Sequence, residues 1–256
     1  MISRPVRIRV WGPWACFTRP EFHVERVSYP VITPSAARGV LEAILMKPIE
    51  KPEADRRDHK IGFRWHVLRI GVVKKGTLTS ILRNELGYAS HNYEGYDIGD
   101  MKKVRTQRHS LILKGCERDQ CQIEYLIDAA IEVPGSVKRI GDEFLVAKYQ
   151  GMFERRAKAG QCHHRPYLGC REFPCDFEWA PNTEPPAGCE DFGMIFRDFD
   201  FDPMWEHWAA GARPSEWARE HGPQALQPLH AKSGADGWIM VSRIVEGNGR
   251  RKVVPA

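Results

Sequence analysis

Residues 76 to 109 combine the two kinds of side chain that bind single-stranded nucleic acid. Aromatic rings stack on bases and cations meet phosphates, so an alternation of the two suits an RNA strand. A connection this long, with little apolar periodicity, is typical of a functional or mobile segment. A solvated surface hairpin has the same composition, and both interpretations stay open. The segment carries three tyrosines and five basic residues: Tyr88, Tyr93, Tyr96, Arg83, Lys102, Lys103, Arg105 and Arg108.

The cysteines and histidines allow a different chemistry. Cys116 and Cys121 form one pair with four intervening residues, Cys170 and Cys175 form another, and Cys162–His164 precedes the second pair. Four thiolates could close a structural zinc site, although this spacing is looser than in a zinc knuckle. Seven cysteines are an odd number, which favours reduced thiols over a disulfide framework. A zinc-binding or thiol-based protein is therefore one interpretation of these cysteines. The other is that they are scattered free thiols without a shared function.

Composition limits the remaining classes. The chain has 256 residues, 42% of them hydrophobic, which is enough for one large domain or one domain with a small appendage. The net charge of +5 does not by itself establish an anionic partner. No segment approaches the roughly 18 to 20 apolar residues of a membrane span, and the N-terminus has no apolar signal-peptide core. We therefore expect a cytoplasmic protein with no membrane partner.

A helix is predicted immediately after Thr33. Thr33 can accept a hydrogen bond as the N-cap, and Pro34 loses no bond at the first helical position. Gly39 would cost about 1 kcal/mol against alanine inside a helix, which predicts a close approach there by another backbone or a ligand. Before the helix, Phe22–Val31 has the pattern of a half-buried strand. The apolar face of the helix recurs through Ala37, Val40, Leu41 and Ile44.

The rest of the chain contains further strands and a second strong helix. Asp142–Lys158 has an apolar stripe that includes Tyr149 and Phe153, a basic last turn, and Gly160 where a C-terminal cap belongs. The order strand, helix, strand at the start of the chain predicts an α+β, ferredoxin-like fold. A short helix is predicted at Pro214–His221. Strands are predicted at Val6–Val10, Phe63–Lys74, Ser110–Leu113, Tyr125–Ile131, Cys175–Trp179, Phe192–Phe201 and Gly237–Val245, followed by a basic tail.

The residues around the first helix also resemble a known family. The motif RPE-x-x-x-ERVSY is followed by TPSAARG-x-LEAI-x-x-KP, and together they span residues 19 to 48. This stretch is similar to the fifth CRISPR-associated protein family in its type I-C (Dvulg) branch, whose members are RAMP-superfamily subunits of the Cascade effector. The likeness extends from about residue 6 to 205 and includes residues 82–85, 105–108, 152–161 and 165–174.

The resemblance implies a ferredoxin-like RAMP domain over residues 1–180, with a β-hairpin thumb inserted at about 76–109, and a small C-terminal β-rich extension over 181–256. It implies a metal-independent endoribonuclease, without a cofactor, that cuts the CRISPR repeat transcript near the base of its hairpin. The protein would then stay on the 5′ handle of the crRNA, with the backbone and large subunits of type I-C Cascade as partners. The alternative is a catalytically inactive scaffold that caps the crRNA while another protein processes it.

Cleavage through a ribose 2′-OH needs a base, a cation for the charge on phosphorus, and an acid for the leaving oxygen. The family places these groups on a tyrosine or histidine at the end of the first helix and on a lysine–histidine pair in the second. Those positions correspond here to Leu45 and to Lys148 with Tyr149, which we assign as catalytic. Leu45 can do no acid–base chemistry, and a tyrosine with its ordinary pKa near 10 is poorer than histidine at neutral pH. Tyr149 also fits a core position on its helix.

Other residues complete the predicted site. His23 or His109 could substitute for a missing acid–base group, and the bases of the handle could stack on Tyr88 or Tyr93. Arg171 and Glu172 are expected to form a structural pair. The resemblance implies RNA contacts by Arg26, Arg38, Lys47, Arg83, Arg105, Gln107, Arg108 and Arg155, each of which would otherwise be an ordinary surface group.

Overall fold

The computed structural model describes residues 1–22, 25–47, 62–86, 105–116, 122–133, 142–200, 224–247 and 250–256. Within them, the side chains of residues 84–86, 105–107, 142–143, 224, 247 and 250 are not described. His23, the tyrosines at positions 88, 93 and 96, Cys121 and the predicted helix Pro214–His221 lie outside these ranges. None of the helices in the described ranges is long and apolar enough to cross a membrane.

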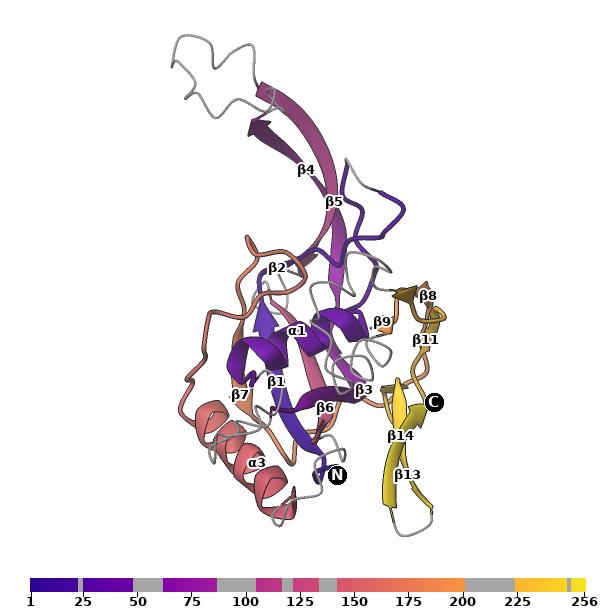
Figure 1. Cartoon of the computed structure of the whole chain (residues 1–256). Helices are drawn as coiled ribbons and strands as arrows, with labels where there is room; N and C mark the ends of the chain where they lie inside the picture. The colour runs from indigo at the N-terminus through magenta and orange to yellow at the C-terminus, as the bar shows by residue number, and fades with distance from the viewer. Residues whose placement is uncertain are drawn as a thin grey trace.

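The centre of the molecule is a five-stranded antiparallel sheet with two helices packed on one face (Figure 1). Its elements are β1 (Val6–Gly12), α1 (Pro34–Ile44), β3 (Arg64–Lys74), β6 (Ile123–Glu132), α3 (Asp142–Lys158), β7 (Asp176–Trp179) and β12 (Trp238–Met240). The strand order is β12-β3-β6-β1-β7, and the first six elements give the βαββαβ succession of ferredoxin-like folds. The predicted α+β class is confirmed.

The first helix begins as its sequence predicts. The Thr33 hydroxyl accepts from the amide of Ala36 at 3.2 Å, and Pro34 occupies the first turn. The predicted apolar face is buried. A Cβ added to Gly39 would meet nothing within 4 Å, so the predicted approach of another backbone is wrong for the described chain, and approach by a ligand stays a prediction.

The second helix also has the predicted bounds, Asp142–Lys158. Tyr149 and Phe153 are buried in the main core. Gly160 ends the helix with φ of +63°, a left-handed conformation that glycine adopts without a Cβ clash. Both helices therefore form where local periodicity and capping require them.

The sheet face away from the helices carries a ladder of ion pairs. Three carboxylates recur at every fourth residue of β6, and the neighbouring strands β1 and β3 supply their cations. The shortest contacts are Arg7 Nε–Asp128 at 2.5 Å, Arg9 Nε–Glu124 at 2.6 Å, Arg64 Nε–Glu132 at 2.5 Å and Arg69 Nε–Asp128 at 2.6 Å. Trp238 covers part of this face, with its ring 4.7 Å from the Arg7 guanidinium and 4.1 Å from that of Arg69.

A long hairpin leaves the body at the end of β3 (Figure 1). It consists of β4 (Gly76–Leu86) and β5 (Arg105–Gly115), which pair along their whole length. The short strand β2 (Trp14–Ala15) pairs with β5 near the body. The predicted strand Ser110–Leu113 is therefore the inner part of a longer strand that begins at Arg105.

Two predicted strands differ from the structure. Phe22–Val31 forms no strand in its described part; isolated bridges join Thr18 to Ser28 and Val27 to Leu111, and the Ser28 amide donates to the Leu111 carbonyl at 2.8 Å. This segment lies along the edge of β5, where only a few of its amides find partners. Phe192–Phe201 is divided into β8 (Asp191–Ile195) and β9 (Phe199–Asp200).

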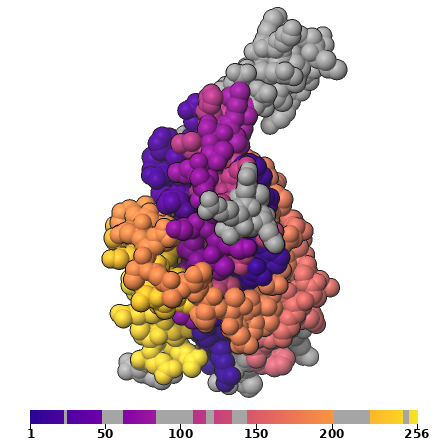
Figure 2. Space-filling view, turned by 180° about the vertical axis from the view of Figure 1, so that it is seen from behind, coloured from indigo at the N-terminus to yellow at the C-terminus, as the bar shows by residue number. Residues whose placement is uncertain are grey.

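The C-terminal part contains more strand than the sequence predicts. The single predicted strand Gly237–Val245 is two strands, β12 and β13 (Ser242–Gly247), and the basic tail forms β14 (Arg250–Pro255). The tail pairs with β13. Its charged sequence gives no sign of this strand. β10 (Gln224–Ala225) pairs with β9, and β11 (Leu229–Lys232) pairs with β8. From behind, these strands lie beside residues 180–200 (Figure 2).

Candidate active site and nucleic-acid interface

The chain that leaves α1 is held against the C-terminal end of α3 and the segment that follows it. The Ala43 carbonyl accepts from the backbone amides of His163 at 2.8 Å and His164 at 3.2 Å. The Ile44 carbonyl accepts from Arg156 Nη1 at 2.7 Å. These bonds satisfy carbonyls that a helix end leaves without internal partners, and they bring residues 156–164 to the end of α1.

The next residues continue toward the middle of α3. The Leu45 carbonyl accepts from Trp65 Nε1 at 3.0 Å, and the Lys47 carbonyl accepts from the Phe63 amide at 3.2 Å. The Phe63 ring packs on Tyr149 with 4.9 Å between centroids. Residues 43–47, here called the α1 exit strip, therefore run along α3 from its C-terminal end back to Tyr149.

The predicted catalytic positions fall at one end of this strip. The side chain of Leu45 is fully buried, and Tyr149 is 6% exposed within the aromatic core, so both have the burial of packing residues. Lys148 is exposed on the outer side of α3, and Lys47 is half-buried. The structure thus brings Tyr149 to the exit strip and leaves Lys148 as the exposed cation beside it in sequence.

The other end of the strip carries two exposed imidazoles. His163 and His164 are both exposed, with ring centroids 5.6 Å apart. In the sequence they are predicted only as zinc ligands. Their position next to the matched residues 152–161 was the available signal. What sequence could not give is the contact with Ala43, since that carbonyl lies more than a hundred residues earlier.

Arg155 lies on the outer surface of α3. It lines a shallow hollow of about 370 Å³ together with Gly151, Glu154 and Lys158. Lys158 Nζ is 3.8 Å from the Glu154 carboxylate, so the positive charge of this surface is only partly neutralised.

Lys148 precedes Arg156 by eight residues, so the two residues are about 12 Å apart along a helix that rises 1.5 Å per residue.

Arg38 is engaged by carboxylates. Its Nε is 2.7 Å from Asp198 and its Nη1 is 2.6 Å from Glu42. Burial lowers the pKa of Arg38, but the hydrogen bonds and charge of Asp198 and Glu42 outweigh it and raise that pKa. Arg38, which was predicted to contact RNA, therefore connects α1 to the segment before β9.

Arg26 and Arg83 converge beside the hairpin, seven residues along β4 from Gly76. Both contact the carboxylate of Glu172, Arg26 at 3.4 Å, and the Arg83 guanidinium also lies 5.7 Å from the centre of the Phe173 ring. Glu172 pairs with these two arginines, and no pair with Arg171 is found in the described residues, so that prediction is wrong. The reason is that Glu172 faces the hairpin, where it pairs with Arg83 of β4 and with Arg26 of the segment beside β5.

The hairpin has two different faces. Arg108 lies opposite Arg83 in the pairing and is half-buried on the side toward Glu172. Arg105 and Gln107 lie opposite Leu86 and Asn84 near the outer end, and their side chains are outside the description. The other face exposes Leu78, Leu82, Leu111 and the predicted substitute base His109.

Two of the described thiols, Cys16 and Cys170, lie together in a small buried cluster. Cys170 Sγ lies 3.3 Å from Arg26 Nη1, and a hydrogen bond with Cys16, helped by Thr18 and Arg26, lowers the pKa of Cys170 against the effect of burial. Burial raises the pKa of Cys175 to about 12. Among the described residues, no three His, Cys, Asp or Glu side chains are grouped as a metal site would require.

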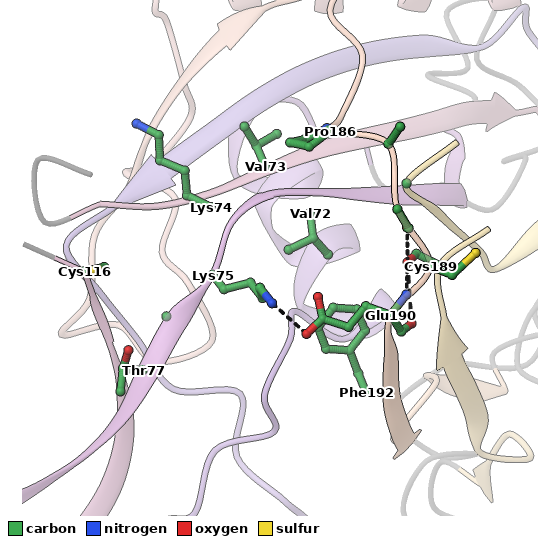
Figure 3. Close-up of a pocket in the computed structure, with 15 residues that line it drawn as sticks. Val72, Val73, Lys74, Lys75, Thr77, Cys116, Pro186, Cys189, Glu190 and Phe192 are labelled. Carbon is green, nitrogen blue, oxygen red and sulfur yellow. Dashed lines mark hydrogen bonds and ion pairs between the residues drawn. The ribbon is translucent and has the colours of Figure 1, made fainter. Parts of the chain in front are cut away.

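A cavity of about 450 Å³ lies where β3 meets β4 (Figure 3). Within it Lys75 Nζ donates to Glu190 at 2.7 Å beside the Phe192 ring. Cys116 lines it, but none of the described residues predicted to act in catalysis or to contact RNA does. The candidate site is therefore the exit strip with α3, and the arginines around Glu172 beside the hairpin form a separate basic region.

Comparison with known proteins identifies the family. The family model for CRISPR-associated protein (Cas_Cas5) matches residues 6–225. This chain belongs to that family. A Thermus thermophilus protein named CRISPR pre-crRNA endoribonuclease Cas5d is 43% identical over 245 residues, covering 92% of this chain and 90% of the relative. A Mannheimia succiniciproducens protein of the same name is 34% identical over 219 residues, covering 78% and 87%. The predicted membership in the type I-C branch is confirmed.

Solved structures agree at the level of the fold. A Streptococcus mutans protein described as functionally uncharacterized superposes with a TM-score of 0.56 at 16% identity, covering 94% of this chain and 93% of its own. A structure described as a CRISPR-associated protein gives 0.53 at 19% identity, covering 99% and 98%. These similarities support the α+β arrangement of the chain.

Proposed function

We propose that this Cas5-family protein is an endoribonuclease that cleaves CRISPR repeat RNA by attack of a ribose 2′-OH, without a metal, and then holds the 5′ handle of the crRNA. Two relatives that align with most of the chain carry the name pre-crRNA endoribonuclease. The observation that carries the proposal is the packing of the exit strip along α3, which brings the exposed His163 and His164 and the Arg156 guanidinium to the end of α1.

The chemistry sets the requirements of this site. The 2′-oxygen attacks phosphorus, the P–O5′ bond breaks, and the products carry a 2′,3′-cyclic phosphate and a 5′-hydroxyl. Because the nucleophile is the 2′-OH, the site cuts RNA and leaves DNA intact. Lys148 is the exposed cation from the predicted pair and stabilises negative charge on the RNA backbone that lies along α3.

The basic hairpin serves as the binding arm in this proposal. It is the counterpart of the family's thumb, and the strands after residue 180 are the counterpart of its small β-rich part. Arg26 and Arg83 hold the hairpin to the body through Glu172, and Arg108, Gln107 and Arg105 follow one another outward along β5. Type I-C Cascade backbone and large subunits are the proposed protein partners.

A catalytically inactive scaffold is the second candidate, and one observation favours it. Leu45 is fully buried and Tyr149 is 6% exposed, so two of the three positions expected to act on RNA are packed in the core. Such a protein would bind repeat RNA without cutting it.

The test is incubation of the purified protein with its own repeat RNA in EDTA, with product ends analysed for a 2′,3′-cyclic phosphate. We expect one cut near the base of the repeat hairpin, and none in RNA with a 2′-deoxy substitution at the cleaved nucleotide. Lys148→Ala should cut at least tenfold more slowly, and Lys232→Ala on exposed β11 is the matched control.

Binding without cutting by the wild-type protein, with or without a divalent metal, would favour the scaffold. Cutting only with a metal would contradict the metal-independent mechanism. An unchanged rate in Lys148→Ala would remove that lysine from the site.

A further inference from the structure

We propose that His163 and His164 are the general acid–base pair of this ribonuclease site, in place of the groups missing at Leu45 and Tyr149. This inference rests on the proposed endoribonuclease function and adds its proton-transfer residues.

The position of the pair is set by the backbone. The amides of His163 and His164 both donate to the Ala43 carbonyl, at 2.8 and 3.2 Å, so the two residues are fixed at the end of α1, two positions before Leu45. Their side chains are exposed, and the centroids lie 5.6 Å apart. One scissile phosphate can therefore meet both imidazoles, as transfer from the 2′-OH and to the 5′-oxygen requires.

The other described histidines are differently occupied. His66 contacts Glu132 at 2.6 Å on the sheet face away from the helices, and His230 contacts Asp191 at 2.8 Å. His109 lies on the hairpin opposite Leu82. Of the five histidines that the structure describes, only His163 and His164 form an adjacent, exposed pair against the helix end where the family places its catalytic group.

A cation lies next to the pair. Arg156 donates one N–H to the Ile44 carbonyl at 2.7 Å, and a guanidinium has five donors, so the remaining edge is available to a phosphate oxygen in the described contacts. Arg165, which follows the pair in sequence, is engaged by Asp176 at 2.5 Å. Lys148, about 12 Å further along α3, would meet the neighbouring part of the same RNA strand.

The reaction balances on these groups. One neutral imidazole takes the proton of the 2′-OH as the 2′-oxygen bonds to phosphorus. The protonated imidazole of the other histidine gives its proton to the 5′-oxygen as the P–O5′ bond breaks. The two rings finish with their protonation exchanged, and solvent restores it. No oxidant, metal or further reactant takes part.

The test compares His163→Ala, His164→Ala and the double variant with wild-type protein on repeat RNA in EDTA. Loss of general acid–base catalysis should slow cleavage by about 100-fold or more in the double variant. Affinity for uncleavable 2′-deoxy RNA should change less than threefold. The fold should be retained, because the described hydrogen bonds of both residues use their backbone amides, and far-UV circular dichroism checks this. His230→Ala is the matched control, with wild-type activity expected.

A second substrate separates the two roles. RNA with sulfur in place of the bridging 5′-oxygen has a leaving group that needs no acid. One single variant should regain a rate close to wild type on this substrate, and the other should stay slow.

If wild-type protein cuts and the double variant is within threefold of it, the histidine pair is refuted while the proposed function stands. If neither single variant regains activity on the sulfur substrate, the assignment of one histidine as the general acid is refuted. If wild-type protein does not cut at all, the proposed function itself fails.

Discussion

Replacing Glu132 by glutamine should destabilise the protein and loosen the candidate site. Glu132 ends β6, with Arg64 Nε at 2.5 Å and His66 Nε2 at 2.6 Å. Burial raises the pKa of Glu132, but the hydrogen bonds and charges of His66 and Arg64 outweigh this and lower it from 4.5 to about 2. Arg64 stands between Phe63 and Trp65, the two residues that bind the exit strip, so the loss reaches the site.

The magnitude follows from linkage. A pKa lowered from 4.5 to about 2 corresponds to about 3 kcal/mol of folding free energy at pH 7, as an order of magnitude. Because the folded-state pKa is below the unfolded one, this stability is complete above about pH 5 and is lost as the pH falls toward 2. At pH 3.5 about 2 kcal/mol remains by the same relation.

Urea unfolding followed by tryptophan fluorescence measures the difference between wild type and Glu132→Gln. We expect the unfolding free energy of Glu132→Gln to be about 3 kcal/mol below that of wild type at pH 7 and about 2 kcal/mol below it at pH 3.5. Glu246→Gln is the control, since its contact with Arg251 at 3.1 Å is exposed and should contribute less than about 1 kcal/mol. A loss below about 1 kcal/mol at pH 7, or a difference that does not change with pH, would refute this reasoning.

Three further substitutions test the framework. Gly39→Ala should raise the unfolding free energy by about 1 kcal/mol, because the added Cβ meets nothing within 4 Å; weakened RNA binding in this variant would instead reveal a ligand at that position. Gly169→Ala should cost several kcal/mol by urea unfolding or prevent folding, since φ is +86° and the Cβ would lie 2.1 Å from the Cys16 carbonyl oxygen; a stability near wild type would contradict the described backbone. Arg38→Ala should cost about 2 to 3 kcal/mol by leaving the carboxylate of Asp198 without its cation; a loss of RNA affinity without loss of stability would return Arg38 to the binding surface.

The ion-pair ladder bears on where RNA can bind. Many ferredoxin-like RNA-binding sheets stack bases on exposed aromatic side chains of the open face. Here that face is filled by paired charges of β1, β3 and β6 and is covered in part by Trp238 and by Glu184, which contacts Arg7 at 2.6 Å. The hairpin and the exit strip are therefore the described surfaces that we propose for RNA binding.

Sequence determined the elements of this protein and its family. Thr33 and Pro34 start α1, the apolar stripe of Asp142–Lys158 makes α3, and Gly160 ends it, because capping and helical periodicity act over a few residues. The motif around residues 19 to 48 was enough to indicate the family that the comparison confirmed. Phe22–Val31 was wrongly predicted as a strand. Alternation of apolar and polar residues indicates only that a segment is half-buried, and an extended segment that lies beside β5 is half-buried without forming a strand.

Tertiary structure decided which partners those side chains meet. Arg38 and Arg83, expected to face RNA, are engaged by Asp198 and Glu172, carboxylates far along the chain. His163 and His164 gained their candidate role only when packing brought their amides to the Ala43 carbonyl. Local patterns record whether a residue is buried, but the identity of a charge or hydrogen-bond partner depends on how distant segments dock. No periodicity in the sequence encodes that choice.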